Sequence, residues 1–395
     1  MHVVIHDVTL TRRAGGSALV SIALLLAVAS ACAKPKPATP APEDLNLSGA
    51  AQFIAGDLAR QLGPGSRTLV IDPLLDRTTG QQTGASAQVE QAIRPAMSEA
   101  LRNVTILPFD AEGAGKSRLV MTGTVAVVTA PDKYTVSVSL SDRQSGLVVA
   151  QSVARFTQGG LDGAPTRFYN DSPSLVRDRS VEGYLRTSET PAGSPADPLY
   201  LEQVPTSALL ADALTAYNAS QWDQALIRYN TAASRQDGQQ LRTFNGIYLC
   251  NVRLSRLDAA EEAFGKIAAL GLATNNLAVK LLFRPGSTEF VADAALSGMY
   301  PRWLRQIGRA ARTTNVCLNI VGHTSRSGSE SINDRLSLNR ATTVRTLLER
   351  ETPGMERLSR VSGVGFRQNL VGSGTDDASD ALDRRVVFEV VACGA

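Results

Sequence analysis

Residues 316–344 constrain the fold of this chain more than any other stretch. An apolar run at residues 316–321 predicts a buried strand, and a turn rich in Gly, Ser and Thr follows it. The hydroxyl and backbone N–H groups of such a turn suit a polar ligand. A helix is predicted from about Ser331, because four residues recur at spacings of three and four and so share one helical face. These residues are Asn333, Leu336, Arg340 and Val344.

Arg340 is the unusual member of this helical face, because a helix commonly buries an apolar side chain there. An arginine at such a position has two roles open to it. Its guanidinium either pairs with a carboxylate of the fold or binds an anion from outside the chain.

Several short motifs in this region follow one another at a spacing typical of one family. They are Gly-His-Thr-Ser at 322–325, Gly-Ser at 328–329, Asn333, Leu336, Ser337, Arg340 and Ala341. They resemble the peptidoglycan-binding signature of the OmpA-like domain, which is found in OmpA, in peptidoglycan-associated lipoproteins and in flagellar motor stator proteins. The resemblance covers roughly residues 277–391. It includes Leu-Phe at 282–283, Gly-Ser at 286–287 and Asp-Arg-Arg-Val at 383–386, where the family has Asn-Arg-Arg-Val.

The resemblance implies a βαβαββ two-layer sandwich with a mixed sheet, and it implies a binding site. In the family, the counterpart of Arg340 binds a carboxylate of the meso-diaminopimelate in the stem peptide of the cell wall, and an Asp in the turn binds its amine. Ser325 stands at the position of that Asp, and Glu330 and Asp334 are the nearby acids that could supply the missing charge. The implied peptidoglycan-binding residues are Thr324, Ser325, Asn333, Leu336, Arg340, Arg384 and Arg385.

The two last arginines of this set form a positive rim in this interpretation. An ion pair within the domain, with Asp383 or Asp380, is the alternative role for Arg384. The family fold also implies a disulfide between Cys317, which opens one predicted strand, and Cys393, which follows the last. Those strands are antiparallel neighbours in the family, and the periplasm is oxidising. Cys250 is expected to be a buried thiol.

The N-terminal residues 1–31 have the composition of a signal peptide. Two arginines precede an apolar run that is too short to span a bilayer comfortably and that ends in small residues. Cys32 then resembles the acylated cysteine of a bacterial lipobox, and Ala33 after it favours the outer membrane. An ordinary signal peptide with a chance cysteine is the alternative. Residues 32–46 are rich in proline and are expected to form a lipidated, extended tether.

The remaining chain predicts a multidomain α+β protein. Residues 47–157 form a small α/β domain whose pattern resembles periplasmic domains of TolB, CsgG and lipoprotein activators of cell-wall synthases. Residues 158–203 are rich in Gly, Pro, Ser and Asp, and they predict a linker that is partly ordered at best. Residues 204–275 are expected to be helical, and residues 276–395 are expected to form the domain that resembles the OmpA-like family. Pro95 is expected to kink a helix, and Pro301 to kink a helix or break it into two segments.

The helical residues 204–275 contain an internal repeat. Ala225 with Tyr229 recurs 35 residues later as Ala260 with Phe264. This interval resembles that of tetratricopeptide repeats, which is about 34 residues. Two units are fewer than a free-standing array needs, so these helices are expected to pack on a neighbouring domain. A helical spacer is favoured over a peptide-binding groove.

Composition excludes several classes of function. The 395 residues carry a net charge of +3 and 43% hydrophobic residues, which fits folded domains rather than a nucleic-acid binder. Of the three histidines, two lie in the targeting segment, which excludes multi-histidine metal sites and argues against a Ser-His-Asp hydrolase. The four cysteines show no zinc spacing. Asp72, Asp76 and Asp110 lie near predicted turns, where carboxylates commonly cap helices or form turns.

The sequence therefore predicts a non-enzymatic outer-membrane lipoprotein without cofactor or metal. It faces the periplasm, binds peptidoglycan through residues 276–395 and tethers the outer membrane to the wall. The alternative is a periplasmic scaffold. In that case the α/β and helical domains bind an envelope complex for secretion, motility or wall synthesis, and the OmpA-like domain only localises it.

Overall fold

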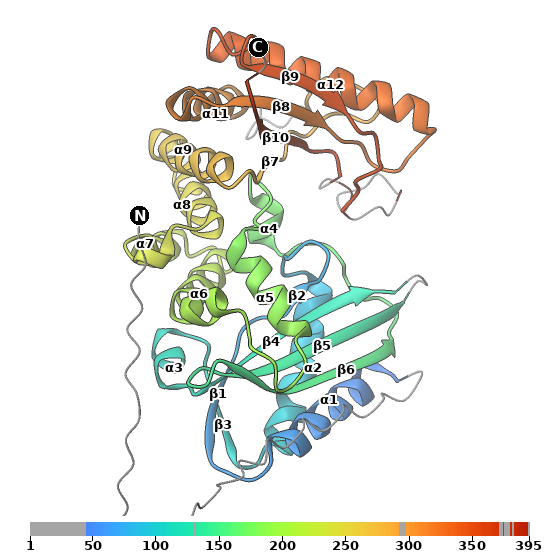
Figure 1. Ribbon diagram of the computed structural model, residues 1–395, viewed down its shortest axis with the longest axis vertical. Coiled ribbons are helices and arrows are strands. Elements are labelled where there is room, and N and C mark those ends of the chain that lie inside the picture. The colour runs from blue at the N-terminus through green and yellow to red at the C-terminus, as the bar shows by residue number, and fades with distance from the viewer. Residues whose placement is uncertain are drawn as a thin grey trace, which may run out of the picture. The chain divides into compact units, whose positions relative to one another are not determined.

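The computed structural model describes residues 45–128, 132–291, 298–370, 374, 380 and 383–393. The predicted signal peptide, Cys32 and the tether up to residue 44 lie outside these residues. The described chain is a mixed α/β protein with two sheets (Figure 1). In the described part, no helix is both long and apolar enough to cross a membrane.

The first sheet has the strand order β3-β1-β4-β5-β6, with β2 paired to β4. β1 is parallel to β3 and β4, whereas β4, β5 and β6 form an antiparallel meander. The apolar faces of α1 and α2 pack on one side of this sheet. The elements are α1 (Leu47–Leu62), β1 (Arg67–Ile71), β2 (Leu75–Asp76), α2 (Gly84–Ala100), β3 (Val104–Leu107), α3 (Ala111–Lys116), β4 (Leu119–Val127), β5 (Lys133–Asp142) and β6 (Leu147–Thr157).

The helices of this domain begin and end where local chemistry favours it. Thr83 and Ser86 form a capping box at the start of α2, with each side chain bonded to the backbone of the other. Gly63 ends α1 with a φ of 63°, a value that L-residues with side chains rarely adopt. Pro95 lies inside α2.

The prediction of a poorly ordered linker at residues 158–203 is wrong. This stretch contains α4 (Arg167–Asp171), α5 (Arg179–Glu189) and the start of α6 (Pro198–Asn218). Its apolar side chains cover the second face of the first sheet, where Val181 and Tyr184 join Val70 and Val120 in one cluster. The polar composition of this stretch suggested a linker, but two of its acids cap helices. Asp178 accepts from N–H groups in the first turn of α5, and Asp197 accepts from the N–H of Tyr200 at 3.0 Å.

Four helices then pack one on the next: α6, α7 (Trp222–Ala233), α8 (Leu241–Arg253) and α9 (Leu257–Ala273). The repeated residues Ala225, Tyr229, Ala260 and Phe264 are all fully buried. Gly246 of α8 permits a close approach, since a Cβ there would lie 2.3 Å from the Tyr229 ring. Because α6 begins at Pro198, the predicted boundary at residue 204 falls inside a helix.

The C-terminal sheet has the order β7-β10-β8-β9, in which β10 is antiparallel to β7 and β8, and β8 is parallel to β9. The chain order is the βαβαββ order that the family resemblance implies. Pro301 lies in the first turn of α11, where proline is tolerated without a kink, and the residues 292–297 that would test the predicted break lie outside the described residues. The elements are β7 (Leu277–Val279), α11 (Tyr300–Thr314), β8 (Cys317–Gly322), α12 (Glu330–Glu351), β9 (Ser359–Gly363) and β10 (Val386–Val391).

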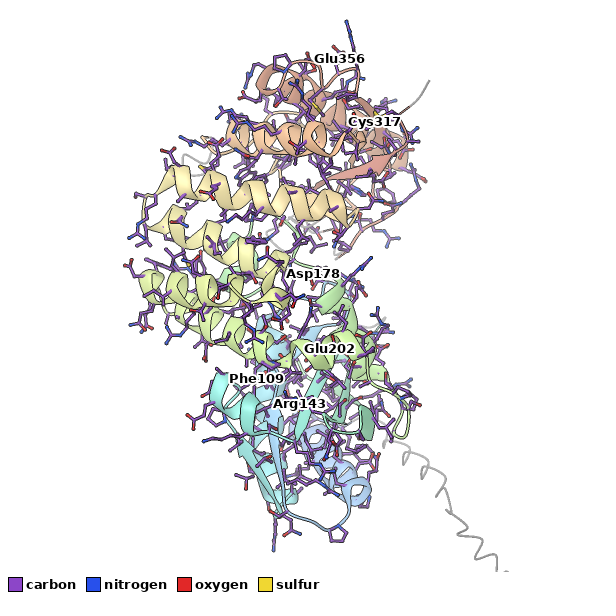
Figure 2. The ribbon with its side chains drawn as sticks, turned by 60° about the vertical axis from the view of Figure 1, so that its left-hand side comes forward. Phe109, Arg143, Asp178, Glu202, Cys317 and Glu356 are labelled. Atoms are coloured by element: carbon purple, nitrogen blue, oxygen red, sulfur yellow. A yellow bond between two sulfur atoms is a disulfide. The ribbon has the colours of Figure 1, made fainter. Side chains whose placement is uncertain are left out.

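Cys317 and Cys393 form a disulfide, with their Cα atoms 5.0 Å apart and a sequence separation of 76. Cys317, labelled in Figure 2, pairs with Val391 where the start of β8 meets the end of β10. Cys250 is a buried free thiol. This is the pairing that the family fold implies.

We expect the double variant Cys317→Ser, Cys393→Ser to be less stable than the wild type by about 2–4 kcal/mol, because the open chain regains loop entropy on unfolding. Urea unfolding of both proteins, with and without reductant, measures this difference. Reductant should lower the stability of the wild type and leave the double variant unchanged. Two reactive thiols at these positions in the unreduced wild type would contradict the pairing.

Candidate functional site

The turn between β8 and α12 lies against the helix because two glycines let the strands approach it. A Cβ on Gly322 would lie 2.0 Å from the carbonyl oxygen of Ser337, and a Cβ on Gly363 would lie 2.4 Å from the N atom of Leu338. The carboxyl ends of β8 and β9 therefore meet the first half of α12 directly (Figure 1). This contact places the turn and the signature helix in one unit.

The turn is held by backbone bonds and by one side chain. The N–H of His323 donates to Arg385 O at 3.1 Å, and the N–H of Thr324 donates to Gly365 O at 3.0 Å. From the first turn of α12, Asn333 donates its Nδ2 to Ser327 O at 2.7 Å and Ser329 O at 3.1 Å. Asn333 therefore shapes the turn from within.

Arg340 is 2% exposed, one of the largest fully buried side chains of the protein. Its Nε donates to Ser287 O and its Nη2 to Arg284 O, both at 3.0 Å. Its Cζ lies 4.9 Å from the centre of the Phe283 ring, a cation–π distance. These three contacts come from the segment that follows β7, so the guanidinium joins α12 to that segment.

That segment is a short hairpin at residues 282–291, called the clamp hairpin below. Arg284 N donates to Glu289 O at 2.8 Å, and Val291 N donates to Leu282 O at 2.9 Å. Gly286, at its tip, has a φ of 65°, which favours glycine there. The Gly-Ser pair of the family signature is thus part of the clamp that holds Arg340.

The other sequence-predicted residues occupy different depths. Thr324 and Ser325 are 1% and 4% exposed. Leu336 and Arg384 are half-buried. Arg385 is 8% exposed and donates to Gln368 O at 3.1 Å, so it does not form an exposed rim. Burial lowers the pKa of Arg385 to about 10, an effect that nearby Asp383 opposes. For Arg384, the choice between rim and ion pair stays a prediction.

His323 is a member of the site that sequence reasoning did not single out. It is 2% exposed, and burial, together with the positive charge of Arg385, lowers its pKa to about 3. The imidazole is therefore neutral at physiological pH. Neither its ring nitrogens nor Thr324 Oγ1 has a hydrogen-bond partner among the described residues. The turn therefore offers neutral polar groups beside the buried Arg385.

The nearby acids are already engaged. Glu330 and Asp334 both form ion pairs with Arg367, at 2.9 and 2.7 Å. The sequence suggested that one of them could replace the charge missing at Ser325. Their shared pairing with Arg367 makes each a weaker partner for a ligand amine.

The acids of the first domain have structural roles. Asp76 accepts from the N–H of Thr79 at 2.7 Å, and Asp110 caps α3. Asp72 is buried and accepts from the Tyr200 hydroxyl at 3.0 Å; burial raises its pKa to about 7. The described residues contain no cluster of His, Cys, Asp and Glu that could hold a metal ion.

No family model and no curated protein matches the chain. Among solved structures, it is similar to the peptidoglycan-associated lipoprotein from Burkholderia pseudomallei, with 21% identity over 28% of this chain and 88% of that one and a TM-score of 0.24. The cell wall anchor of the T6SS from Pseudomonas aeruginosa matches at 21% identity over 29% and 80%, with a TM-score of 0.23. The LpoB C-terminal domain from Salmonella enterica matches at 13% identity over 29% and 100%, with a TM-score of 0.24.

Proposed function

We propose that residues 276–395 bind peptidoglycan non-covalently, and that the chain is an outer-membrane lipoprotein that tethers the membrane to the wall. In this proposal it is a binding protein and not an enzyme. The observation that carries the proposal is the unit formed by β8, its turn and α12. Its turn carries Thr324 and Ser325 and is shaped by Asn333, and its helix carries Arg340, which bonds to the clamp hairpin.

The ligand group that suits this unit is a carboxylate. Arg340 supplies a permanent positive charge, and charge-assisted hydrogen bonds contribute about 1.5–3 kcal/mol. Because the guanidinium is 2% exposed, water screens that charge little. Binding also involves the clamp hairpin, since two of its carbonyls accept from the same guanidinium.

The hydroxyls of Thr324 and Ser325 and the amide of Asn333 supply neutral hydrogen bonds. A stem peptide that ends in diaminopimelate carries both a carboxylate and an amine. This site offers the amine a hydroxyl at Ser325 rather than a charge. We therefore expect recognition dominated by the carboxylate.

The direct test is sedimentation of the purified full-length protein with isolated sacculi. The proposal requires that the protein co-sediments and that a soluble diaminopimelate-containing peptide competes with the sacculi. A protein that stays in the supernatant at every concentration would refute it.

Arg340→Gln should abolish binding to sacculi, because it removes the charge while keeping an amide that can still donate to the hairpin carbonyls. We expect a loss of at least tenfold, since about 1.4 kcal/mol corresponds to a factor of ten. Arg350→Gln, the same change near the end of α12, is the matched control. A melting curve of each variant shows whether it is folded. Wild-type binding by a folded Arg340→Gln protein would remove Arg340 from the site.

Ser325→Asp should bind a diaminopimelate-containing peptide more tightly, by something like tenfold, because the new carboxylate gives the ligand amine a counter-charge. Ser327→Asp, two residues along the same turn and exposed, is the control. Calorimetric titration of both variants and the wild type measures the effect. An unchanged or weaker affinity of Ser325→Asp would mean that the amine is recognised elsewhere or that the natural ligand differs.

Cys32→Ala should release the protein from the membrane into the soluble periplasm. Two acyl chains anchor a protein stably, and the variant has no acylation site at this position. Fractionation of cells that express either protein measures the distribution. A variant that stays in the membrane fraction would count against lipidation at Cys32.

A further inference from the structure

The clamp hairpin is attached to the helical part of the chain at its base. Lys280, two residues before the hairpin, is 9% exposed. Its Nζ donates to Tyr169 O at 2.5 Å and to Asn170 O at 3.3 Å, the last carbonyls of α4. A cation at the carboxyl end of a helix is favoured by the helix dipole and by the unpaired carbonyls there. Carbonyl oxygens of α4 thus bind the ammonium group of Lys280.

The backbone on either side of Lys280 is held by the same segment. The N–H of Lys280 donates to Pro173 O, and the N–H of Leu175 donates to Ala278 O, both at 2.9 Å. Residues 173–175 therefore run along the edge of β7 and extend the C-terminal sheet. This stretch lies in the region that the sequence alone presents as a linker.

The charges around Lys280 have a defined arrangement. Burial lowers the pKa of its ammonium to about 8, and the negative charge of Asp171 opposes this effect. Asp171 itself pairs with Arg253 of α8 at 2.5 Å and accepts from the Tyr217 hydroxyl of α6 at 2.8 Å. Arg167 of α4 approaches it at 3.8 Å. Lys280 therefore joins a polar cluster that links α4, α6 and α8.

A second connection runs through aromatic rings. Arg340 covers the ring of Phe283. The centre of this ring lies 4.8 Å from that of Phe290 across the hairpin, and the ring centres of Phe290 and Tyr300 are 4.5 Å apart. Tyr300 lies 5.2 Å from Trp303 of α11.

The chain of rings then reaches the helical region. Trp303 stacks on Phe264 of α9 at 5.2 Å and donates its Nε1 to the Tyr248 hydroxyl of α8 at 3.0 Å. Each ring in this series, from Phe283 under the guanidinium to Phe264 of α9, contacts the next, and each such ring pair is favourable.

We propose that Lys280 and Trp303 are positioning residues for Arg340, so that α4 and the helical region both contribute to wall binding. The inference rests on the proposed function of residues 276–395. Its physical basis is that the two carbonyls and the ring that hold the guanidinium all belong to the clamp hairpin. The hairpin in turn is fixed at its base by Lys280 and on its apolar side by the rings that end at Trp303. Loosening either support moves the groups that orient Arg340.

The test uses the full-length protein with Lys280→Met, which keeps the length of the side chain and removes its donors. We expect sacculus binding to weaken by about tenfold at a temperature where the variant is folded. We also expect faster hydrogen exchange at the amides of residues 282–291. Val89→Ala, in the core of the first sheet, is the control for a general loss of stability. It should lower the melting temperature and leave both readouts unchanged.

Trp303 provides an independent pair of variants. Trp303→Phe keeps a ring between Tyr300 and Phe264 and should bind sacculi within a few-fold of the wild type, whereas Trp303→Leu removes the ring and should behave like Lys280→Met. If Lys280→Met does not fold, the difference in sacculus binding between Trp303→Phe and Trp303→Leu tests the inference by itself.

The outcomes separate the inference from the function on which it rests. Wild-type binding together with unchanged hairpin exchange in Lys280→Met and Trp303→Leu would overturn the inference. If the wild type itself does not bind sacculi, the proposed function fails. The exchange rates then still show whether Lys280 and Trp303 hold the hairpin.

Discussion

The buried guanidinium of Arg340 is the interaction on which the candidate site depends. It donates to two backbone carbonyls of the clamp hairpin and lies over one of its aromatic rings, on the same helix whose first turn carries Asn333. Burying an arginine costs free energy unless its N–H groups are hydrogen-bonded. Arg340 therefore favours the hairpin conformation that supplies those bonds, in addition to providing a positive charge. The same residue can therefore serve the fold and a ligand.

The helical region is integrated with the C-terminal sheet rather than strung beside it. Buried side chains of α6 to α9 form one continuous cluster with those of α11, α12 and the C-terminal sheet. The last helix of this region, α9, has an apolar face that another element must cover. α11 packs on α9 and provides that cover.

Much of the fold could be predicted from local pattern. The signature helix and the strand before it follow from apolar periodicity and turn residues, whereas the family resemblance implied the order of the C-terminal elements. The α5 segment could not be predicted, because its apolar residues are few and make sense only once Val70 and Val120 of the sheet are seen to need cover. His323 was missed because the sequence around a single histidine does not reveal whether its side chain is buried or what lies beside it. Its burial beside Arg385 comes from the pairing of β8 with β10.

The sequence by itself determined the chemistry of the candidate site: an arginine on a helical face, a hydroxyl-rich turn before it, and a serine where the resembled family has an acid. These are properties of residue type and spacing, which need no tertiary contact. The tertiary structure decided what surrounds that arginine, because the hairpin carbonyls lie more than 50 positions away along the chain. It also decided that Glu330 and Asp334 are paired with Arg367, and that the Lys280 ammonium bonds to a carbonyl of α4. Contacts between such distant segments form only when the whole domain packs.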